Sequence, residues 1–306
     1  MIAGIDIGGT TSKIGLVQEG RVLRQVRIST TGHADDHAFA DALAQAVRQL
    51  CIQEGSPAIE AVGIGAPNAN QFTGIIEMAP NLPWKHDVPL ARMMQDRLGA
   101  PAVLGNDANA AALGEWRYGA GQGFDDLLVV TIGTGVGSGF IVNGQLVLGS
   151  AGNAGELGHM TIVVDGRLCT CGRKGCLETY VSIRGMRQTY AELADDLDVL
   201  KEEGVKCIAD AAHRGDQAAL RTFEETVRWL AIGLANAVAV TGPRRVVLFG
   251  GIVRSGELLL APLKRAFQVA LLNIYQGRVD ITVSALADDD AALLGAAALA
   301  TTLTRT

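Results

Sequence analysis

The chain has 306 residues, 48% of them hydrophobic and 19% charged, which is typical of a globular protein with room for two α/β lobes. Its net charge of −6, without a basic stripe, argues against a nucleic-acid-binding protein. The first residues lack the features of a signal peptide, and no run of 18 apolar residues predicts a membrane span. Five cysteines do not suit a disulfide scaffold, so we expect a reducing, cytoplasmic location.

The first third of the chain predicts strands that alternate with helices. Apolar runs bounded by glycine turns predict three strands, and a helical period with an apolar face follows them. A buried strand, a loop rich in Asn, Gly and Pro, a helix, a further strand and an alanine-rich helix come next. The expected elements are strands 2–7, 13–17 and 22–29, helix 35–54, strand 61–65, loop 67–84, helix 90–98, strand 102–104 and a helix ending near residue 118.

The second part of the chain begins like the first. Residues 5–10 match residues 130–135 at an ungapped offset of 125, and this offset also matches Val17 to Val142 and residues 18–19 to 143–144. Glycine-turned hairpins also recur by chance. We interpret the match as an internal duplication that gives two related lobes. The predicted smaller lobe is 1–117 with 290–306, and the larger lobe is 118–289.

The remaining elements belong mostly to the predicted larger lobe. A loop rich in glycine and cysteine covers residues 149–178, and a long helical stretch follows to about residue 241. A buried strand over 246–249 delivers two glycines, and an alanine-rich helix covers 289–303.

Three glycine turns, each after an apolar strand, are candidate phosphate sites. The first turn includes Gly8, Gly9, Thr10 and Thr11, the second runs from Gly133 to Gly137, and the third is Gly250-Gly251. Small residues let the backbone approach an anion, and consecutive N–H groups form a concavity for its oxygens. Because hairpins flank the first two, neither the dinucleotide fingerprint nor the phosphate loop explains them.

Carboxylates follow two of the predicted strands of the first lobe. Asp6 ends the first strand and can hold Mg²⁺ through water. Asp107 lies where a strand gives way to a helix, so it is either a catalytic base or a helix N-cap.

The cysteine-rich loop carries a set of metal-binding residues. His159 is followed by Cys169, Cys171 and Cys176, and one imidazole with three thiolates is a tetrahedral zinc set. The alternatives are a disulfide or an unligated cluster, which the close spacing and the reducing compartment disfavour. We predict a structural zinc site, which brings Glu156 and Glu178 together to bind sugar hydroxyls.

These motifs together resemble the ROK family of sugar kinases and repressors. The resemblance rests on residues 6–10, Gly105-Asn-Asp-Ala-Asn109, Glu156-Leu-Gly-His159 and the cysteine segment 169–178. It implies a two-lobed actin-like or hexokinase-like ATPase fold, with duplicated ribonuclease H-like lobes that close on ATP and sugar. It also implies a homodimer or higher homo-oligomer.

The resemblance assigns roles to single residues. Asp107 is similar to the family's catalytic base. The residues similar to the family's hexose contacts are Asn81, Asn106, Asp107, Glu156, His159 and Glu178. The zinc ligands correspond to His159, Cys169, Cys171 and Cys176. The nucleotide and Mg²⁺ contacts correspond to Asp6, Gly8, Gly9, Thr10, Thr11, Lys13, Gly133, Thr134, Gly135, Gly137, Gly250 and Gly251. Asn68 stands where many members have the glycine of a Pro-Gly pair, so the resemblance does not predict the adjoining part of the sugar pocket.

The resemblance implies an ATP-dependent kinase that converts glucose to glucose 6-phosphate. The alternatives are a kinase for N-acetylmannosamine, N-acetylglucosamine or fructose, a sugar-responsive repressor, and a non-catalytic sugar sensor. The first glycine turn begins within ten residues of Met1, which leaves no space for the repressors' helix-turn-helix module. A sensor is expected to lose the base or the turns, and this chain keeps both.

Overall fold

The computed structural model describes residues 1–55, 58–79 and 81–304. The predicted loop 67–84 and the predicted lobe segment 290–306 therefore include residues (80, 305 and 306) that lie outside the described part. The chain forms two compact units: unit 1 is Met1–Gly123, Gln145–Ala154 and Ala285–Thr306, and unit 2 is Phe124–Gly144 and Gly155–Ser284. Residues 145–154, which the predicted boundaries assigned to the second lobe, thus make their contacts within unit 1.

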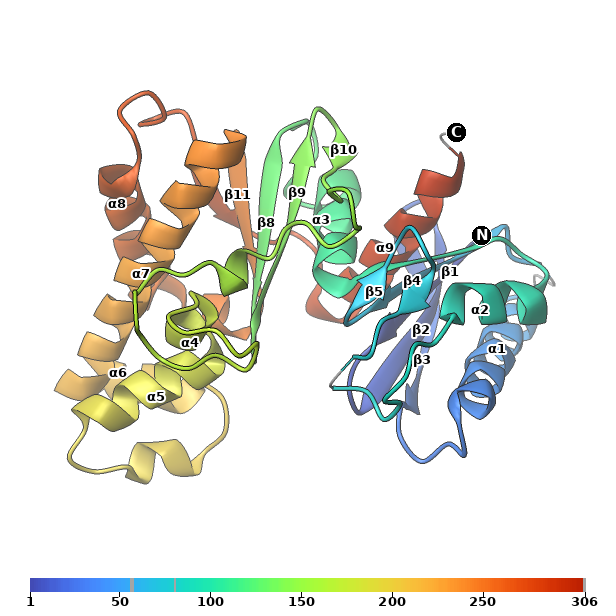
Figure 1. The fold of residues 1–306 in the computed structure, drawn as a ribbon, viewed down its shortest axis with the longest axis horizontal. Helices are drawn as coiled ribbons and strands as arrows, with labels where there is room; N and C mark the ends of the chain where they lie inside the picture. The colour runs from blue at the N-terminus through green and yellow to red at the C-terminus, as the bar shows by residue number, and fades with distance from the viewer. Residues whose placement is uncertain (56–57, 80, 305–306) are drawn as a thin grey trace. The chain divides into compact units, whose positions relative to one another are not determined.

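Unit 1 contains a five-stranded mixed sheet (Figure 1). The strand order is β3-β2-β1-β4-β7, in which β1 pairs antiparallel with β2 and parallel with β4, and β4 pairs parallel with β7. The strands are β1 (Ile2–Ile7), β2 (Thr11–Gln18), β3 (Arg21–Ser29), β4 (Ala61–Ala66) and β7 (Ala102–Asn106). Parallel strands end at one edge of their sheet, so the carboxyl ends of β1, β4 and β7 lie together.

Helices cover both faces of this sheet. α1 (Asp36–Gln53) and α2 (Leu90–Leu98) pack together on one face. α3 (Asp107–Tyr118) and the C-terminal helix α9 (Asp288–Ala300) pack together, and α9 also contacts β1 and β4. The end of the chain therefore completes the unit that its beginning forms.

Local sequence explains where α1 begins and what it buries. The side chain of Asp35 accepts a hydrogen bond from the N–H of Ala38 (2.8 Å), which caps the first turn. Phe39, Leu43 and Val47, spaced at the helical period, are buried in the core of unit 1. The predicted helix and its apolar face are confirmed.

Unit 2 repeats the sheet of unit 1. Its strand order is β10-β9-β8-β11-β12, with β8 antiparallel to β9 and parallel to β11, and β11 parallel to β12. The strands are β8 (Leu127–Ile132), β9 (Val136–Val142), β10 (Gln145–Leu146), β11 (Arg245–Phe249) and β12 (Asp280–Val283). By contacts, the short edge strand β10 is counted with unit 1.

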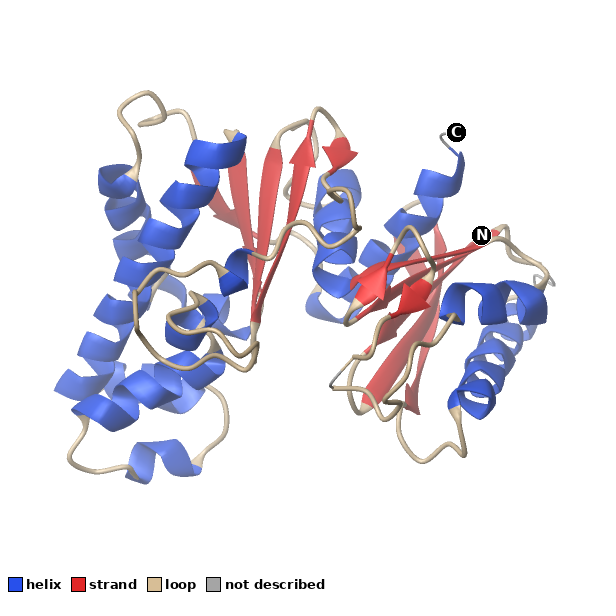
Figure 2. Cartoon of the chain, in the orientation of Figure 1, coloured by secondary structure: helices blue, strands red, loops and turns tan. Residues whose placement is uncertain are grey.

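The helices of unit 2 surround one long helix. α7 (Gln217–Thr241) contacts α4 (Glu178–Val181), α5 (Ile183–Leu193), α6 (Lys206–His213) and α8 (Leu260–Ala270). Figure 2 shows these helices beside the second sheet. Short 3₁₀ helices lie at Leu157–His159, Asp198–Lys201, Gly251–Leu258 and Thr301–Thr304.

Strand register corrects the predicted repeat by one residue. Ile2 pairs with Val17 in β1–β2, and Leu127 pairs with Ile141 in β8–β9, so Val17 corresponds to Ile141 and not to Val142. The offset of 125 holds for β1 and β8 and becomes 124 after the glycine turn, because the second turn is one residue shorter. The corresponding hairpin turns are therefore 19–20 and 143–144, and all four of these residues have positive φ.

Several elements were not predicted. The loop 67–84 contains a small hairpin of β5 (Ala69–Asn70) and β6 (Ile75–Ile76), whose strands are too short for a periodic signal. Helix α8 and strand β12 between residues 252 and 288 were also missed. Among the described residues, no helix combines the length and the hydropathy that a membrane crossing needs.

Candidate active site and metal centre

The carboxyl edge of the sheet in unit 1 brings two acids together. Asp6 of β1, Gly65 of β4 and Gly105 of β7 lie side by side in the strand register. A methyl group on Gly65 would lie 3.9 Å from Asp6 Oδ1 and 3.8 Å from Asp107 Cα. Both acids therefore lie close to Gly65 at the centre of this edge.

The helix cap that follows β7 is Asn106 and not Asp107. Asn106 Oδ1 accepts hydrogen bonds from the N–H groups of Ala108 (2.9 Å) and Asn109 (3.4 Å), which satisfies the first turn of α3. Asp107 is the first helical residue, and its Oδ1 accepts a hydrogen bond from the Ala108 N–H at 2.8 Å. The capping role that competed with a catalytic one for Asp107 thus belongs to its neighbour.

Both acids hold their protons more tightly than ordinary aspartates. Burial, and then the charge of Asp107, raise the pKa of Asp6 to about 6, while the Lys13 ammonium lowers it. Asp107 keeps solvent-accessible surface, yet the protein atoms around its carboxylate desolvate it and raise its pKa, against the lowering effect of the Ala108 N–H. Two neighbouring carboxylates with raised pKa values mark this edge as a candidate functional site.

The first glycine turn begins two residues after Asp6. The N–H of Gly8 donates to the carbonyl of Thr11 at 3.1 Å and closes the turn. In the described part of the chain, the amides of Gly9 and Thr10 donate no hydrogen bond to protein. The carbonyl of Asn81 lies over Gly9, 2.9 Å from where a Cβ would stand. The predicted role of the two amides as donors to a phosphate stays a prediction.

The predicted segment 81–84 alternates between exposed residues, Asn81 and Pro83, and a buried apolar anchor. Leu82 and Trp84 are buried in the core of unit 1, where the Trp84 ring contacts Phe39 at a centroid distance of 4.8 Å. Asn81 is exposed beside the first glycine turn. Of this segment, Asn81 is the residue whose backbone lies against the glycine turn, and its predicted contact with the hexose stays a prediction.

The second glycine turn occupies the corresponding edge in unit 2. The Gly133 N–H donates to the Gly135 carbonyl at 2.9 Å, and the Val136 N–H donates to Glu178 Oε2 at 2.9 Å. Gly250 follows β11 with φ of 115°, and a Cβ there would overlap the carbonyl of Ile132. Only glycine fits that position, and it lies next to the second turn.

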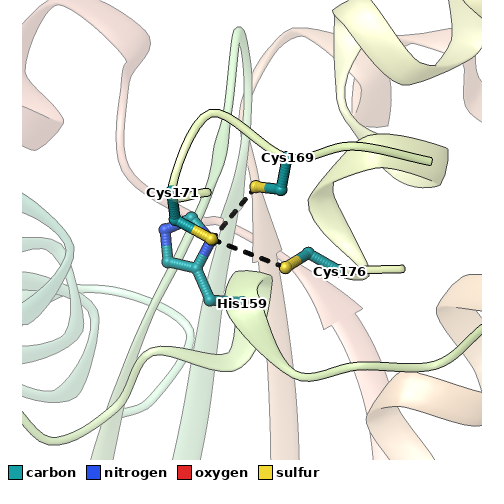
Figure 3. A group of neighbouring side chains, drawn as sticks. All are labelled: His159, Cys169, Cys171 and Cys176. Atoms are coloured by element: carbon teal, nitrogen blue, oxygen red, sulfur yellow. Dashed lines mark hydrogen bonds between the residues drawn. The ribbon is translucent and has the colours of Figure 1, made fainter. Parts of the chain in front are cut away.

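The four predicted metal ligands form one cluster. Their ligand atoms all lie within 4.8 Å of one another, and Figure 3 shows the three thiol groups and the imidazole converging. Cys171 Sγ lies 3.7 Å from Cys176 Sγ, and Cys169 Sγ lies 3.6 Å from His159 Nδ1. A tetrahedral ion with bonds of about 2.3 Å to sulfur would set its sulfurs about 3.8 Å apart, so the cluster fits a zinc-like ion.

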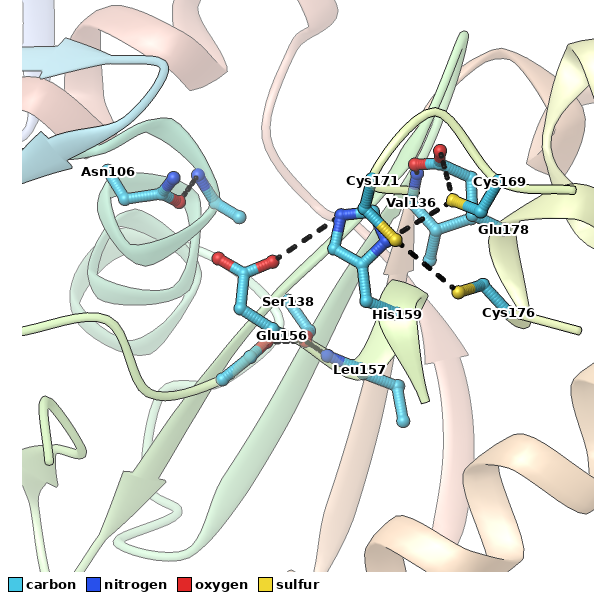
Figure 4. Close-up of polar contacts among 12 residues, drawn as sticks. Asn106, Val136, Ser138, Glu156, Leu157, His159, Cys169, Cys171, Cys176 and Glu178 are labelled. Atoms are coloured by element: carbon cyan, nitrogen blue, oxygen red, sulfur yellow. Dashed lines mark hydrogen bonds and ion pairs between the residues drawn. The ribbon is translucent and has the colours of Figure 1, made fainter. Parts of the chain in front are cut away.

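Glu156 and His159 lie on the segment that enters the metal loop (Figure 4). Nδ1 of His159 faces the thiols, and its Nε2 is 4.0 Å from Glu156 Oε2, so the imidazole connects the cluster with an exposed carboxylate. Ser138, buried on β9, fixes this segment: its hydroxyl donates to the Gly155 carbonyl and accepts from the Leu157 N–H at 3.2 Å.

Sequence reasoning missed the residues that support this site. Ser138 and Arg167 are polar residues that belong to no recognised motif, and the residues next to them in the sequence gave no sign of their roles. Asn70 was also missed, although its side chain is buried and makes three hydrogen bonds. A search for buried polar side chains in the folded structure finds Asn70 and Ser138, because such groups need partners.

The profile of the ROK family matches residues 2–303 of the chain. The chain belongs to the ROK family. It is 35% identical to a glucokinase of Thermotoga maritima, over 97% of this chain and 96% of that protein. A ROK glucokinase of Streptomyces griseus, solved with glucose and AMPPNP, is 37% identical and matches 98% of this chain and 99% of its own with a TM-score of 0.81. The ROK hexokinase of Thermus thermophilus is 32% identical, with a TM-score of 0.86 over 99% of both chains.

The predicted fold class is confirmed: this ROK protein has the two-lobed sugar-kinase fold with mixed sheets and a Cys/His cluster. The structure places the predicted residues in two sets, each within one unit. Asp6, residues 8–11, Lys13, Asn81, Asn106 and Asp107 lie in unit 1. Residues 133–137, Glu156, His159, Glu178, the cysteines and residues 250–251 lie in unit 2. Their individual roles stay predictions.

Proposed function

We propose that this ROK protein is an ATP-dependent glucokinase that makes glucose 6-phosphate. The supporting observation is its likeness, over nearly the whole chain, to a glucokinase solved with glucose and AMPPNP. The geometry supports the proposal, since phosphoryl transfer to an alcohol needs an acid beside the acceptor and donors for the phosphate oxygens. Asp107 follows the carboxyl end of β7, and the amides of Gly9 and Thr10 donate to no other group in the described part of the chain.

In the proposed reaction, Asp107 accepts the proton of the glucose 6-hydroxyl. The freed oxygen attacks the γ-phosphorus, the bond to the β,γ-bridging oxygen breaks, and ADP leaves. The amides of Gly9 and Thr10 are donors for phosphate oxygens. Asp6 would hold Mg²⁺ through water molecules of the ion's hydration shell, and the ion would supply positive charge for the transferring group. Because Asn106 caps α3 through Oδ1, its amide NH₂ is directed to a sugar hydroxyl in this proposal.

The metal loop has a structural role in this proposal. His159, Cys169, Cys171 and Cys176 would fill all four positions of a zinc ion, which leaves none for a substrate. We expect purified protein to contain close to one zinc per chain by plasma mass spectrometry. Cys171→Ser should lose most of it, whereas Cys207→Ser, at a buried cysteine outside the cluster, should retain it. Equal zinc contents in the two variants would contradict the assignment.

Two further properties stay predictions. We predict a reducing, cytoplasmic location, in which cysteines stay free of disulfides. We also predict a homodimer or larger homo-oligomer, which light scattering of the purified protein would measure.

The deciding experiment is a coupled assay of ADP release with glucose, mannose, fructose, N-acetylglucosamine and N-acetylmannosamine. We expect the highest kcat/KM with glucose. A higher value with fructose or an N-acetylhexosamine would assign the chain to a sister kinase. Sugar binding by calorimetry without ADP release from any of the five would identify a sensor.

A further inference from the structure

The segment that carries Glu178 lies against the second glycine turn. The Val136 N–H donates to Glu178 Oε2 at 2.9 Å, and the Ile183 N–H donates to the carbonyl of Gly133 at 2.9 Å. The two hydrogen bonds lie at opposite ends of the turn. Their partners outside the turn, Glu178 and Ile183, are five positions apart in the sequence. The segment from Glu178 to Ile183 therefore holds the turn at both ends, and Figure 4 shows the contact of Glu178 with Val136.

Glu178 fits closely on the turn. A methyl group on Gly135 would lie 2.6 Å from Glu178 Oε2, so the carboxylate occupies the space that the glycine leaves. A hydrogen bond from a backbone amide to a carboxylate is stronger than one between neutral groups. Since one amide of the turn is bound by this carboxylate, the conformation of the turn depends on where Glu178 lies.

The metal loop fixes the position of Glu178. The backbone N–H of Thr179 and its hydroxyl both donate to the carbonyl of the cysteine ligand Cys176, at 3.0 and 2.7 Å. The Leu177 N–H donates to the Met160 carbonyl at 2.9 Å. Glu178 Oε1 lies 4.0 Å from Sγ of the second ligand, Cys169. The residues at the start of α4 thus contact both segments of the loop that carry the metal ligands, one before and one after Cys169.

Arg167 holds the same segment from its other side. Its guanidinium donates to the carbonyls of Thr179 (2.9 Å) and Gly185 (3.2 Å), and it lies 4.7 Å from the ring centroid of Tyr180. Arg167 belongs to the metal loop, two residues before Cys169, so these contacts also attach the junction of α4 and α5 to that loop. The carboxylate of Glu178 and the backbone of α4 therefore both depend on the metal loop.

We infer that Glu178 is a positioning residue for the second glycine turn. Through Glu178, the metal cluster sets the conformation of this turn and so the nucleotide affinity of the chain. The inference rests on the proposed function, in which residues 133–137 bind the phosphates of ATP. It gives Glu178 a role separate from the sugar contact predicted for it, because Oε2 accepts a hydrogen bond from the backbone of the turn itself.

The test measures AMPPNP binding by calorimetry in the absence of sugar. Glu178→Gln keeps a side-chain oxygen that can accept from the Val136 N–H, and it should bind AMPPNP within about twofold of the unaltered protein. Glu178→Ala leaves that N–H without its acceptor, and binding should weaken about tenfold, the effect of one charge-assisted hydrogen bond. Glu224→Ala is the matched control, since it removes an exposed carboxylate on α7 that has no role in the proposed site, and it should bind AMPPNP normally.

A second arm removes the metal with a chelator and follows its loss by plasma mass spectrometry. Metal removal should weaken AMPPNP binding in the unaltered protein and cause little further loss in Glu178→Ala, since both changes break the same connection. Circular dichroism checks that each sample is folded, and Glu178→Gln supplies the comparison if Glu178→Ala is not.

Each outcome has a separate meaning. Equal AMPPNP affinity of the unaltered protein and folded Glu178→Ala would overturn the inference and leave the proposed function standing. Weakening by Glu178→Gln as large as that by Glu178→Ala would also overturn it, because the accepting oxygen would then be irrelevant. If the unaltered protein bound no AMPPNP, the proposed function and this inference would both fail.

Discussion

At the scale of single residues, the division of labour between Asn106 and Asp107 gives a direct prediction. Because Asn106 caps α3, Asp107→Asn should leave the helix and the melting temperature nearly unchanged. Turnover should fall by about 10²–10⁴-fold, the usual contribution of a general base, while glucose still binds. Steady-state kinetics and calorimetry measure the two effects, with the exposed Asp87→Asn as the control. Near-normal turnover of Asp107→Asn would remove this residue from the proposed mechanism.

Asp6 should destabilise the fold at neutral pH, because its pKa is raised from 3.8 to about 6. An acid with a raised pKa in the folded state binds more protons there than in the unfolded chain, so stability increases as pH falls through about 6 and levels off below 3.8. The difference corresponds to at most about 3 kcal/mol, and to less where water screens the carboxylate.

Asp6→Asn removes the charge and should therefore raise the melting temperature at pH 8 while abolishing kinase activity. At pH 4, where Asp6 is mostly protonated, the same substitution should have little effect on stability. Thermal melts at the two pH values without nucleotide or added magnesium measure this difference. A stabilisation of the same size at both pH values would show that the charge is not its source.

The residues that could be predicted from sequence are those whose partners are near in sequence. Cys169, Cys171 and Cys176 lie within eight residues, and their spacing alone indicated a metal site. Ser138 and Arg167 act on segments that the fold brings to them, from β9 and from α4 and α5. No periodicity encodes such contacts, so the sequence predicted the Cys/His cluster but not the residues that support it.

At the scale of elements, the small hairpin of β5 and β6 holds a distant segment. Nδ2 of Asn70 donates to Glu77 Oε1 (2.8 Å) and to the carbonyl of Ala151 (2.9 Å), and its Oδ1 accepts from the Phe72 N–H (3.0 Å). Ala151 belongs to residues 145–154, the part of unit 1 that precedes Glu156. Asn70 thus attaches this segment to unit 1, which the offset repeat gave no reason to expect.

Asn70→Ala should destabilise the protein by about 1–3 kcal/mol, because it leaves buried backbone groups without partners. Asn70→Asp should be worse at pH 7, since it puts a carboxylate beside Glu77 and loses the two donors. Urea unfolding measures both, and the exposed Asn153→Ala in the same segment should stay within about 0.5 kcal/mol of the unaltered protein. If Asn70→Asp were the more stable of the two substitutions, the donor role would be wrong.

Elements with a strong period were predicted well and short ones were not. Helix α1 was found to within one residue at each end, because a capping aspartate and an apolar face agree. β5 and β6 have two residues each, below the length at which alternation can be seen. The repeat was recognised from β1 and β8, but the shorter second turn became visible only in the strand register.

At the scale of the whole molecule, unit 1 cannot finish folding without the C-terminal helix α9. Helix α9 packs on β1 and β4 of the first sheet and on α3. It follows β12 as α3 follows β7, so the two equivalent helices of the repeat pack together within unit 1. Contacts between the first and the last residues of a chain have a large loop-closure cost, which favours late completion of this unit.

Two paired glycines make this packing close. Gly4 of β1 and Gly63 of β4 are neighbours in the sheet register, and both lie under the backbone of α9. A Cβ on Gly4 would stand 2.5 Å from the carbonyl oxygen of Leu293, and one on Gly63 would overlap the carbonyl of Ala296. Neither contact can be relieved by a side-chain rotation, because the opposing atoms belong to a helix backbone.

Gly63→Ala should therefore cost about 3 kcal/mol, at the upper end for overpacking, and lower the melting temperature of unit 1. Gly251→Ala is the matched control, because the nearest atom to its added methyl group is 4.0 Å away. Differential scanning calorimetry compares the two, and only Gly63→Ala should shift the transition by several degrees. Equal melting temperatures would mean that α9 moves away from the sheet at little cost, and unit 1 would then not depend on close packing of the C-terminal helix.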